Sequence, residues 1–571
     1  MTRRRPLLGA VLATLVAAPL LLIGLGRVPF DDPGEGMHAQ IARELRAGGD
    51  PFALHLNGVP YVDKPPLLYT LVASAFALAG ESESTARTVS AVAALVAIAA
   101  TAGFAAQLLG IAGGLVAGSA LLTSAGFFVY SRYLRPETLF IAALALGFAL
   151  MLTGVVRGRR SLVTLGLACF GLASLAKDPL GALIPPLVVG LALALAGRVR
   201  PFGAWLPWPG VIAWLVLGFG WWVLAEMRTP GFTWYTVVDN HVLNIVRARQ
   251  FPDEDAPIGP VTFLVVSAIG AAPWIVAAAF TVVRLVRSRA WRDPDELPWT
   301  TLTLWSTGLL VAVMLSPFRL PHYGLPAYPA IALLAARAWS ESRSRTLLTA
   351  HAATLVAAAA ACVIAWRGGT AAVADSVMTA TDVATVKATA VGYALAPPPW
   401  EEIVPLFSST AVLAAVGALG LGILAIGRRP ARWSGAAIVL ATMIAVMPAV
   451  TSGLSSFSAH RTVRALAEEL ARHAKAADLV VHEGPIENSG ALEWYSARRP
   501  VIVDGRHSVL SFGATLNAET FWEPARLGSA WRSDRRVWII TTRAPEVSLV
   551  TALPGARLVA TDGGRRLYVN R

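Results

Sequence analysis

Polar and charged side chains gather between residues 27 and 86 of a 571-residue chain in which only 15% of residues are charged. Carboxylates, histidines and a lysine share this segment: Asp31, Asp32, Glu35, His38, Glu44, Asp50, His55, Asp63 and Lys64. Carboxylates held beside apolar helices can serve as a general base for a hydroxyl or amine, or as ligands for a cation. Helix capping and solvation at a membrane surface are the alternative interpretation of Asp32 and Glu35.

Lysine is rare among the 48 basic residues of the chain, which makes Lys64 in Tyr-Val-Asp-Lys-Pro-Pro distinctive. Its ammonium group is a compact cation suited to a phosphate. A lysine at this position can also extend its charge to the membrane surface, but arginine would serve that purpose equally well. We therefore predict that Lys64 binds an anion. Lys177, in Lys-Asp-Pro, has the same two interpretations, a phosphate contact or an inert turn.

Other candidate site residues lie between later apolar runs. Glu137 begins one such run, where a carboxylate is costly unless it is paired or used. It can act catalytically or form an inert ion pair with Arg132 or Arg135. His241, which precedes Arg247 and Arg249, can ligate a metal or hold a phosphate, whereas His322 in Leu-Pro-His-Tyr fits a structural role better.

Long apolar runs must position these residues. The chain is 55% hydrophobic, and its mean hydropathy is +0.59. Continuous apolar runs of this kind predict membrane-spanning helices. We predict thirteen spans, at 8–26, 87–109, 111–130, 136–155, 161–177, 180–197, 207–227, 260–287, 298–316, 323–341, 346–366, 403–426 and 434–453. The shorter run 66–80 is predicted to be a juxtamembrane or re-entrant helix.

Arginines between the runs predict the orientation. With the N-terminus in the cytoplasm and 66–80 omitted from the spans, Arg157, Arg159, Arg160, Arg198 and Arg200 fall in cytoplasmic loops, as the positive-inside rule requires. The net charge of +13 is thereby explained without a nucleic-acid partner. The candidate site residues then share the outer face. The first apolar run is expected to be a retained span, and Cys169 and Cys362 to form no disulfide.

The segment 455–571 has a different pattern of polar and apolar residues from the membrane domain at 1–454. Residues 460–477 show helical spacing, and 478–482, 500–505, 536–542 and 556–570 are typical of strands and a hairpin. A small extracytoplasmic α/β domain is expected here, acting as a lid or docking module.

Several stretches in a fixed order carry a family resemblance. They are GEGMHAQIAREL, HLNGVPYVDKPPLLY, RPETLF, LAKDPLG, DNHVLNIVR and LPHYGLPAYPAIALLAA. Over residues 8–345 the chain resembles the GT-C membrane glycosyltransferases that use lipid-phosphate sugars, and is similar to the aminoarabinose–lipid A transferase and protein O-mannosyltransferase families.

The resemblance implies a bacterial inner-membrane transferase that takes a sugar from a polyprenyl phosphate and gives it to a lipid, glycan or protein acceptor. It implies catalytic carboxylates in the first two outer loops (Asp32 or Glu35, and Glu137) and donor contacts from Lys64. The residue-level reading adds Lys177, Arg132, Arg135, Arg247 and His322 as candidate substrate contacts. Asp63 and His241 match positions that ligate a divalent ion, so zinc, magnesium or manganese is expected, with no nucleotide cofactor.

The chain departs from the family pattern where relatives commonly have Asp-Glu followed by Arg-Tyr. Gly34 occupies the usual aspartate position, so either Asp32 or Glu35 takes over the role or the activity is altered. A transporter or flippase, and a catalytically degenerate relative with a binding role, are the alternative functions.

Overall fold

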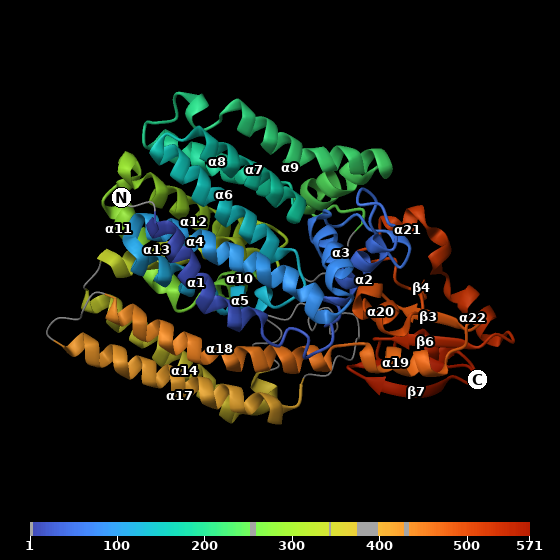
Figure 1. Ribbon diagram of the computed structural model, residues 1–571. Helices are drawn as coiled ribbons and strands as arrows, with labels where there is room; N and C mark the ends of the chain where they lie inside the picture. Colours follow the sequence, from blue (N-terminus) through green and yellow to red (C-terminus); the bar gives the residue numbers. More distant parts are fainter. Residues whose placement is uncertain (1–3, 252–257, 342–343, 374–397, 428–432) are drawn as a thin grey trace.

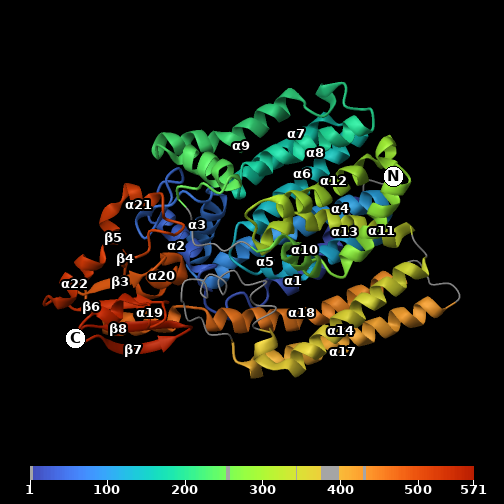
Figure 2. The same ribbon diagram turned by 180° about the vertical axis from the view of Figure 1, so that it is seen from behind.

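The computed structural model describes residues 4–251, 258–341, 344–373, 398–427 and 433–571. A helical bundle forms one part of the molecule and a smaller domain with a sheet forms the other, with the first polar segment between them (Figures 1 and 2). The bundle helices are α1 Arg4–Leu22, α4 Glu83–Leu122, α5 Ala125–Ser131, α6 Glu137–Arg157, α7 Arg160–Ala176, α8 Leu180–Leu195, α9 Trp208–Arg228, α10 Pro260–Gly270, α11 Trp274–Arg287, α12 Leu297–Leu315, α13 Tyr328–Glu341, α14 Arg345–Val373, α17 Trp400–Ile426 and α18 Ser434–His460.

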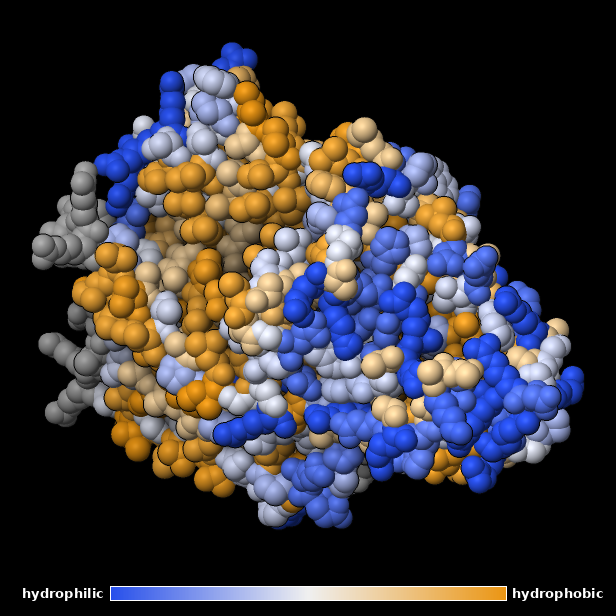
Figure 3. All heavy atoms as spheres, turned by 45° about the vertical axis from the view of Figure 1, so that its right-hand side comes forward, coloured by the Kyte–Doolittle hydropathy of each residue, from blue (hydrophilic) through white to orange (hydrophobic). Residues whose placement is uncertain are grey.

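The bundle confirms the predicted multi-pass helical membrane protein. Among the described residues, 7 helices are long and apolar enough to cross a membrane, or up to 8 if one bent pair counts as a single span. Shorter apolar helices, including α7 and α8, accompany them. Figure 3 shows apolar side chains over the bundle and hydrophilic ones over the C-terminal domain. The count of thirteen spans stays a prediction.

Two breaks within the bundle differ in how well the sequence predicted them. Gly110, where a tight turn was predicted between two spans, has φ +82° inside the continuous range of α4. By contrast, the predicted single span 260–287 is two helices, α10 and α11, bent by 107° at a break. The residues between them include Pro273, which cannot donate a backbone hydrogen bond to continue the first helix.

The first polar segment folds into short elements against the bundle. These are α2 Gly36–Arg46, the strand pair β1 His55–Leu56 and β2 Val59–Pro60, and α3 Leu67–Ala79. α3 is the run predicted to be juxtamembrane. It packs against α2 and the start of α4, burying Leu68, Tyr69, Val72 and Phe76. Because α3 buries this apolar face against α2 and α4, a short hydrophobic helix is stable beside the polar residues of the segment.

The C-terminal domain is built on a six-stranded sheet in the order β5-β4-β3-β6-β8-β7. The strands are β3 Leu479–Glu483, β4 Val501–Val503, β5 Phe521–Trp522, β6 Val537–Thr541, β7 Arg557–Asp562 and β8 Arg565–Val569. β3, β4, β5 and β6 are parallel, while β7 and β8 form the antiparallel hairpin predicted at 556–570. β5 was not predicted, because two residues give no period. α18 continues past the expected boundary at 455, and α19 Arg464–His473 follows it.

One apolar core joins the C-terminal domain to the first polar segment. Phe30, Ile41 and Leu68 belong to the same buried cluster as Leu466 and Ile540. Burial of apolar surface is the main favourable term in packing. The C-terminal domain is therefore docked on the segment that carries most of the predicted site residues.

Candidate functional site

Glu137 lies at the centre of a group of cations at the start of α6. Its side chain is 3% exposed, and the Lys177 Nζ lies 3.1 Å from Oε1 and the Arg135 Nε 3.5 Å from Oε2. The His322 Nε2 lies 3.4 Å from Oε1. The carboxylate also sits in the first turn of a helix, where the helix dipole favours negative charge. We call Glu137, Arg135, Lys177 and His322 the Glu137 cluster.

Three different parts of the chain supply this cluster. Arg135 precedes α6 in the loop after α5, Lys177 caps the C-terminus of α7, and His322 lies in the 3₁₀ segment Pro321–Ala327 before α13. The Lys177 Nζ also lies 5.1 Å from the ring centroid of Tyr323, a cation–π distance. Four of the predicted site residues are thus brought together by the fold.

Lys64 lies beside the Glu137 cluster. Its Nζ is 2.5 Å from Asp63 Oδ2. Burial alone would lower the pKa of Lys64, but the Asp63 carboxylate outweighs it, so the pKa is raised and the side chain stays charged. Glu137 and Arg135 are also close enough to act on Lys64. Lys64 and Lys177 thus bring two positive charges close to one carboxylate, an arrangement that a bound anion would stabilise.

His241 pairs with Asp178, next to Lys177. Its Nε2 lies 2.9 Å from Asp178 Oδ2 and its Nδ1 lies 2.7 Å from the carbonyl oxygen of Thr236. Burial lowers the pKa of His241, but the hydrogen bond to Asp178 and the charge of Asp178 together outweigh burial. The net effect is a raised pKa. Asp178 was named in the sequence only as part of its turn. Its side chain is the one that orients His241.

The two predicted metal ligands are engaged with other groups. Asp63 pairs with Lys64 through Oδ2, and both ring nitrogens of His241 lie within hydrogen-bond distance of other groups. In the described part of the chain, no three His, Cys, Asp or Glu side chains come close enough to hold a metal ion. As arranged, the donor set does not fit a divalent ion, and the metal stays a prediction.

Asp32 and Glu35 lie in a second buried group that links the first segment to its neighbours. Glu35 pairs with Arg87 of α4 at 2.5 Å and accepts a hydrogen bond from the backbone N–H of Leu134. Asp32 accepts hydrogen bonds from the backbone N–H groups of Val463 at 3.2 Å and Ala491 at 3.0 Å. Among the described contacts, neither carboxylate meets Lys64, Lys177 or Glu137. The structure therefore separates them from the Glu137 cluster.

Tyr133 occupies the space that a side chain at position 34 would need. A Cβ built on Gly34 would lie 2.0 Å from the Tyr133 hydroxyl oxygen and 2.7 Å from its ring carbon Cζ. That hydroxyl donates to Asp31, which also pairs with Arg461. An aspartate at position 34 cannot be accommodated without moving Tyr133. The glycine is therefore part of a packed arrangement in which the tyrosine replaces the missing side chain.

The two remaining arginines are placed away from the Glu137 cluster. Arg132 donates to the carbonyl oxygens of Leu20 at 2.6 Å and Ile23 at 2.9 Å, at the C-terminus of α1, where helix carbonyls lack partners. Arg247 is exposed, with φ +57°, and nothing in the described part of the chain ties it to the cluster. Its neighbour Arg249 instead contacts Asp239 and Asn240.

Sequence reasoning missed three buried groups at the site: His38, Tyr61 and Tyr69. The His38 Nδ1 lies 2.9 Å from the Tyr69 hydroxyl, which donates to the Tyr61 hydroxyl at 3.2 Å. His38 was visible in the polar segment and Tyr61 in the Lys64 motif, but Tyr69 appeared only as part of an apolar run. Their meeting depends on the packing of α2 on α3.

The fold is thus a multi-pass helical bundle with charged residues collected beside a docked α/β domain. Residues 63–222 match the family model described as dolichyl-phosphate-mannose-protein mannosyltransferase. The structure of ArnT from Cupriavidus metallidurans matches with a TM-score of 0.78 at 21% identity, covering 98% of this chain and 97% of that chain. The same protein bound to undecaprenyl phosphate matches with a TM-score of 0.77, covering 98% of each chain. The chain therefore has the ArnT fold, and the resemblance seen in the sequence is confirmed.

Curated relatives agree with this assignment. The undecaprenyl phosphate-α-4-amino-4-deoxy-L-arabinose arabinosyl transferase 2 of Pseudomonas fluorescens is 29% identical over 348 residues, covering 56% of this chain and 55% of that protein. The corresponding transferase of Pseudomonas aeruginosa is 29% identical over 337 residues, covering 55% of this chain and 58% of that protein. The aligned region spans a little over half the length of these relatives.

Proposed function

We propose that the protein is an integral membrane glycosyltransferase that moves a sugar from a polyprenyl-phosphate donor to a lipid, glycan or protein acceptor. The observation that carries the proposal is the gathering of Lys64, Lys177 and Arg135 around Glu137, beside the first polar segment. Matched relatives are named for an undecaprenyl-phosphate sugar donor, and the matched ArnT was solved with undecaprenyl phosphate. These names support a lipid-phosphate donor for this chain.

The chemistry follows from the charges. In the transfer, an acceptor oxygen or nitrogen bonds to the anomeric carbon, and the bond from that carbon to the phosphate oxygen breaks. The leaving polyprenyl phosphate keeps the electron pair. Preorganised cations stabilise such developing charge, and Lys64 and Lys177 are placed to do so. The apolar bundle would hold the prenyl chain, so no nucleotide cofactor is required. The relatives' names favour a pentose with an amino group, and a hexose is the other candidate.

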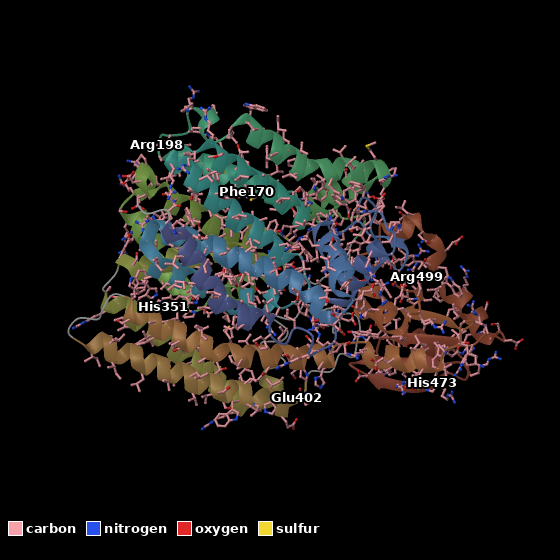
Figure 4. The ribbon with its side chains drawn as sticks, in the orientation of Figure 1. Phe170, Arg198, His351, Glu402, His473 and Arg499 are labelled. Atoms are coloured by element: carbon pink, nitrogen blue, oxygen red, sulfur yellow. The ribbon has the colours of Figure 1, made fainter. Side chains whose placement is uncertain are left out.

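The orientation and the metal belong to the same proposal. We place the protein in a bacterial inner membrane, with its N-terminus in the cytoplasm and the C-terminal domain in the periplasm. This placement rests on the arginines: Figure 4 shows Arg198 at the side of the bundle away from the C-terminal domain. To ligate a divalent ion, His241 would have to leave one of its present partners, Asp178 or the carbonyl oxygen of Thr236. Metal analysis of the purified protein tests this, and a metal content below one per ten chains would exclude a resident ion.

A transfer assay tests the function. Purified protein is given a panel of polyprenyl-phosphate sugars, and released lipid phosphate and transferred sugar are measured. We expect Lys64→Ala to lose about 10²–10³-fold in kcat, as removal of a charge-stabilising donor does. Arg198→Ala is the matched control, because Arg198 is exposed and lies at the side of the bundle away from the C-terminal domain. It should keep wild-type turnover.

The rival functions give different results in the same assay. Saturable binding of the lipid phosphate by wild-type protein, with no donor consumed, would contradict the transferase. It would favour a transporter or a binding relative instead. Equal losses in Lys64→Ala and Arg198→Ala would show that the cation cluster has no special role.

A further inference from the structure

His38 is a buried histidine of α2 to which the proposed function assigns no role. Its side chain is 2% exposed. The Nδ1 atom lies 2.9 Å from the Tyr69 hydroxyl, and that hydroxyl donates to Tyr61 at 3.2 Å. With the Tyr69 hydroxyl donating to Tyr61, the proposed arrangement has Nδ1 donating to Tyr69. The ring is thereby held in one tautomer, with a lone pair on Nε2.

The Nε2 atom of His38 is buried and has no hydrogen-bond partner among the described residues. A buried acceptor without a partner destabilises the fold, and such atoms call for an explanation. The hydrogen bonds to Tyr69 and Tyr61 fix the ring and so fix the direction of the lone pair. A preoriented lone pair that the protein itself leaves unused is suited to a substrate proton.

The surroundings of His38 are those of the donor site. Tyr61 lies three positions before Lys64 in the same motif. The charged groups that act on His38 are Arg135 and Glu137 of the Glu137 cluster and the neighbouring Lys64. The pKa of His38 is lowered to about 3, chiefly by burial and also by Arg135 and Lys64, against the raising effect of Glu137. The ring is therefore neutral, and a bound anionic donor would offset the two cations and make it more basic.

The carboxylates considered for a base are committed elsewhere. Asp32 accepts two backbone N–H groups of the C-terminal domain, and Glu35 pairs with Arg87. Glu137 is surrounded by Lys177, Arg135 and His322, which hold its negative charge in place. Each of these carboxylates thus has partners of its own, whereas Nε2 of His38 has no hydrogen-bond partner among the described residues.

We infer that His38 is the general base of the transfer reaction, its Nε2 taking the proton of the acceptor hydroxyl or amine. This inference rests on the proposed function. As the acceptor atom bonds to the anomeric carbon and the bond to the phosphate oxygen breaks, the acceptor proton moves to Nε2. The imidazolium formed keeps its Nδ1 proton on Tyr69, and the polyprenyl phosphate leaves with the electron pair. The proton on Nε2 passes to the departing phosphate or to water.

Replacement of the ring tests the inference. We expect His38→Gln to lower kcat by 10²–10⁴-fold, the usual contribution of a general base, while the Kd for undecaprenyl phosphate changes less than about threefold. His351→Gln is the matched control. His351 is also a buried histidine with Nδ1 on a backbone carbonyl and Nε2 unpartnered, but it lies in α14, across the bundle from the first segment (Figure 4). That variant should keep wild-type kcat.

A second variant separates chemistry from packing. In His38→Ala, added imidazole should restore part of the lost kcat, because a free base can enter the space left by the ring. No rescue, together with weakened binding of undecaprenyl phosphate, would assign His38 a structural role and overturn the inference. Wild-type kcat in His38→Gln would also overturn it. Failure of the proposed function differs from both, since wild-type protein would then consume no donor.

Discussion

Asp32 is a buried carboxylate that links the first polar segment to the C-terminal domain by hydrogen bonds. Burial is the main cause that raises its pKa, to about 7, against the lowering influence of Arg565 and of the N–H groups of Ala491 and Val463. The folded protein thus holds this proton more tightly than the unfolded chain. The stability from protonated Asp32 is fully present below about pH 4 and is lost as the pH rises through about 7.

The first residue-scale prediction concerns this pH dependence. We expect the free energy of unfolding to fall by about 2 kcal/mol between pH 5 and pH 8, measured as a lower thermal midpoint. Asp32→Asn, which does not titrate, should show a smaller fall. Asp534→Asn is the control, because Asp534 is fully exposed, and it should keep the wild-type slope. An unchanged slope in Asp32→Asn would assign the pH dependence to another group.

Residue-scale chemistry was only partly predictable from the sequence. The rarity of lysine identified Lys64 and Lys177, and the cost of a carboxylate at the start of a span identified Glu137. The assignment of Asp32, Glu35 and Arg132 depended on their neighbours, which come from distant parts of the chain such as Ala491, Arg87 and Leu20. No local pattern carries that information.

At the scale of elements, α4 depends on one glycine. Gly110 has φ +82° and ψ 175°, a conformation that side chains avoid, and a Cβ there would meet nothing within 4 Å. Any effect of a substitution is therefore backbone strain alone. We expect Gly110→Ala to lower the free energy of unfolding by about 1–3 kcal/mol.

Gly308 in α12 provides the matched control for this element-scale prediction. It also has nothing within 4 Å of a built Cβ, but its backbone is helical. Gly308→Ala should be neutral or slightly stabilising, by up to about 1 kcal/mol, because alanine favours the helix. Equal thermal midpoints for the two variants would show that the turn in α4 is not strained.

Elements were predicted well where a regular pattern of apolar residues extends over several positions, or where glycine marks the turn. The turn at Gly110, the strands at 478–482 and 536–542, and the hairpin at 556–570 all have such signals. The bend between α10 and α11 was missed because the apolar run continues across it, and hydropathy alone does not detect a change in direction.

At the scale of the whole molecule, the arginines predict which end of the bundle faces the cytoplasm. A reporter enzyme that is active only in the periplasm, fused after Arg571, should be active if the C-terminal domain is periplasmic. The same reporter inserted at Arg198 should be inactive, since Figure 4 places that residue away from the C-terminal domain. The reverse pattern would invert the orientation.

The core shared by the first polar segment and the C-terminal domain has a consequence for biosynthesis. Phe30 and Ile41 are made early by the ribosome, whereas Ile540 and Val569, which complete the same core, are made last. The early segment must therefore wait, with apolar side chains uncovered, until the rest of the polypeptide has been inserted. A nascent chain halted after α18 would carry this segment in an unfinished state, open to proteases and chaperones. The order of synthesis thus makes assembly of the site one of the final events in the maturation of the protein.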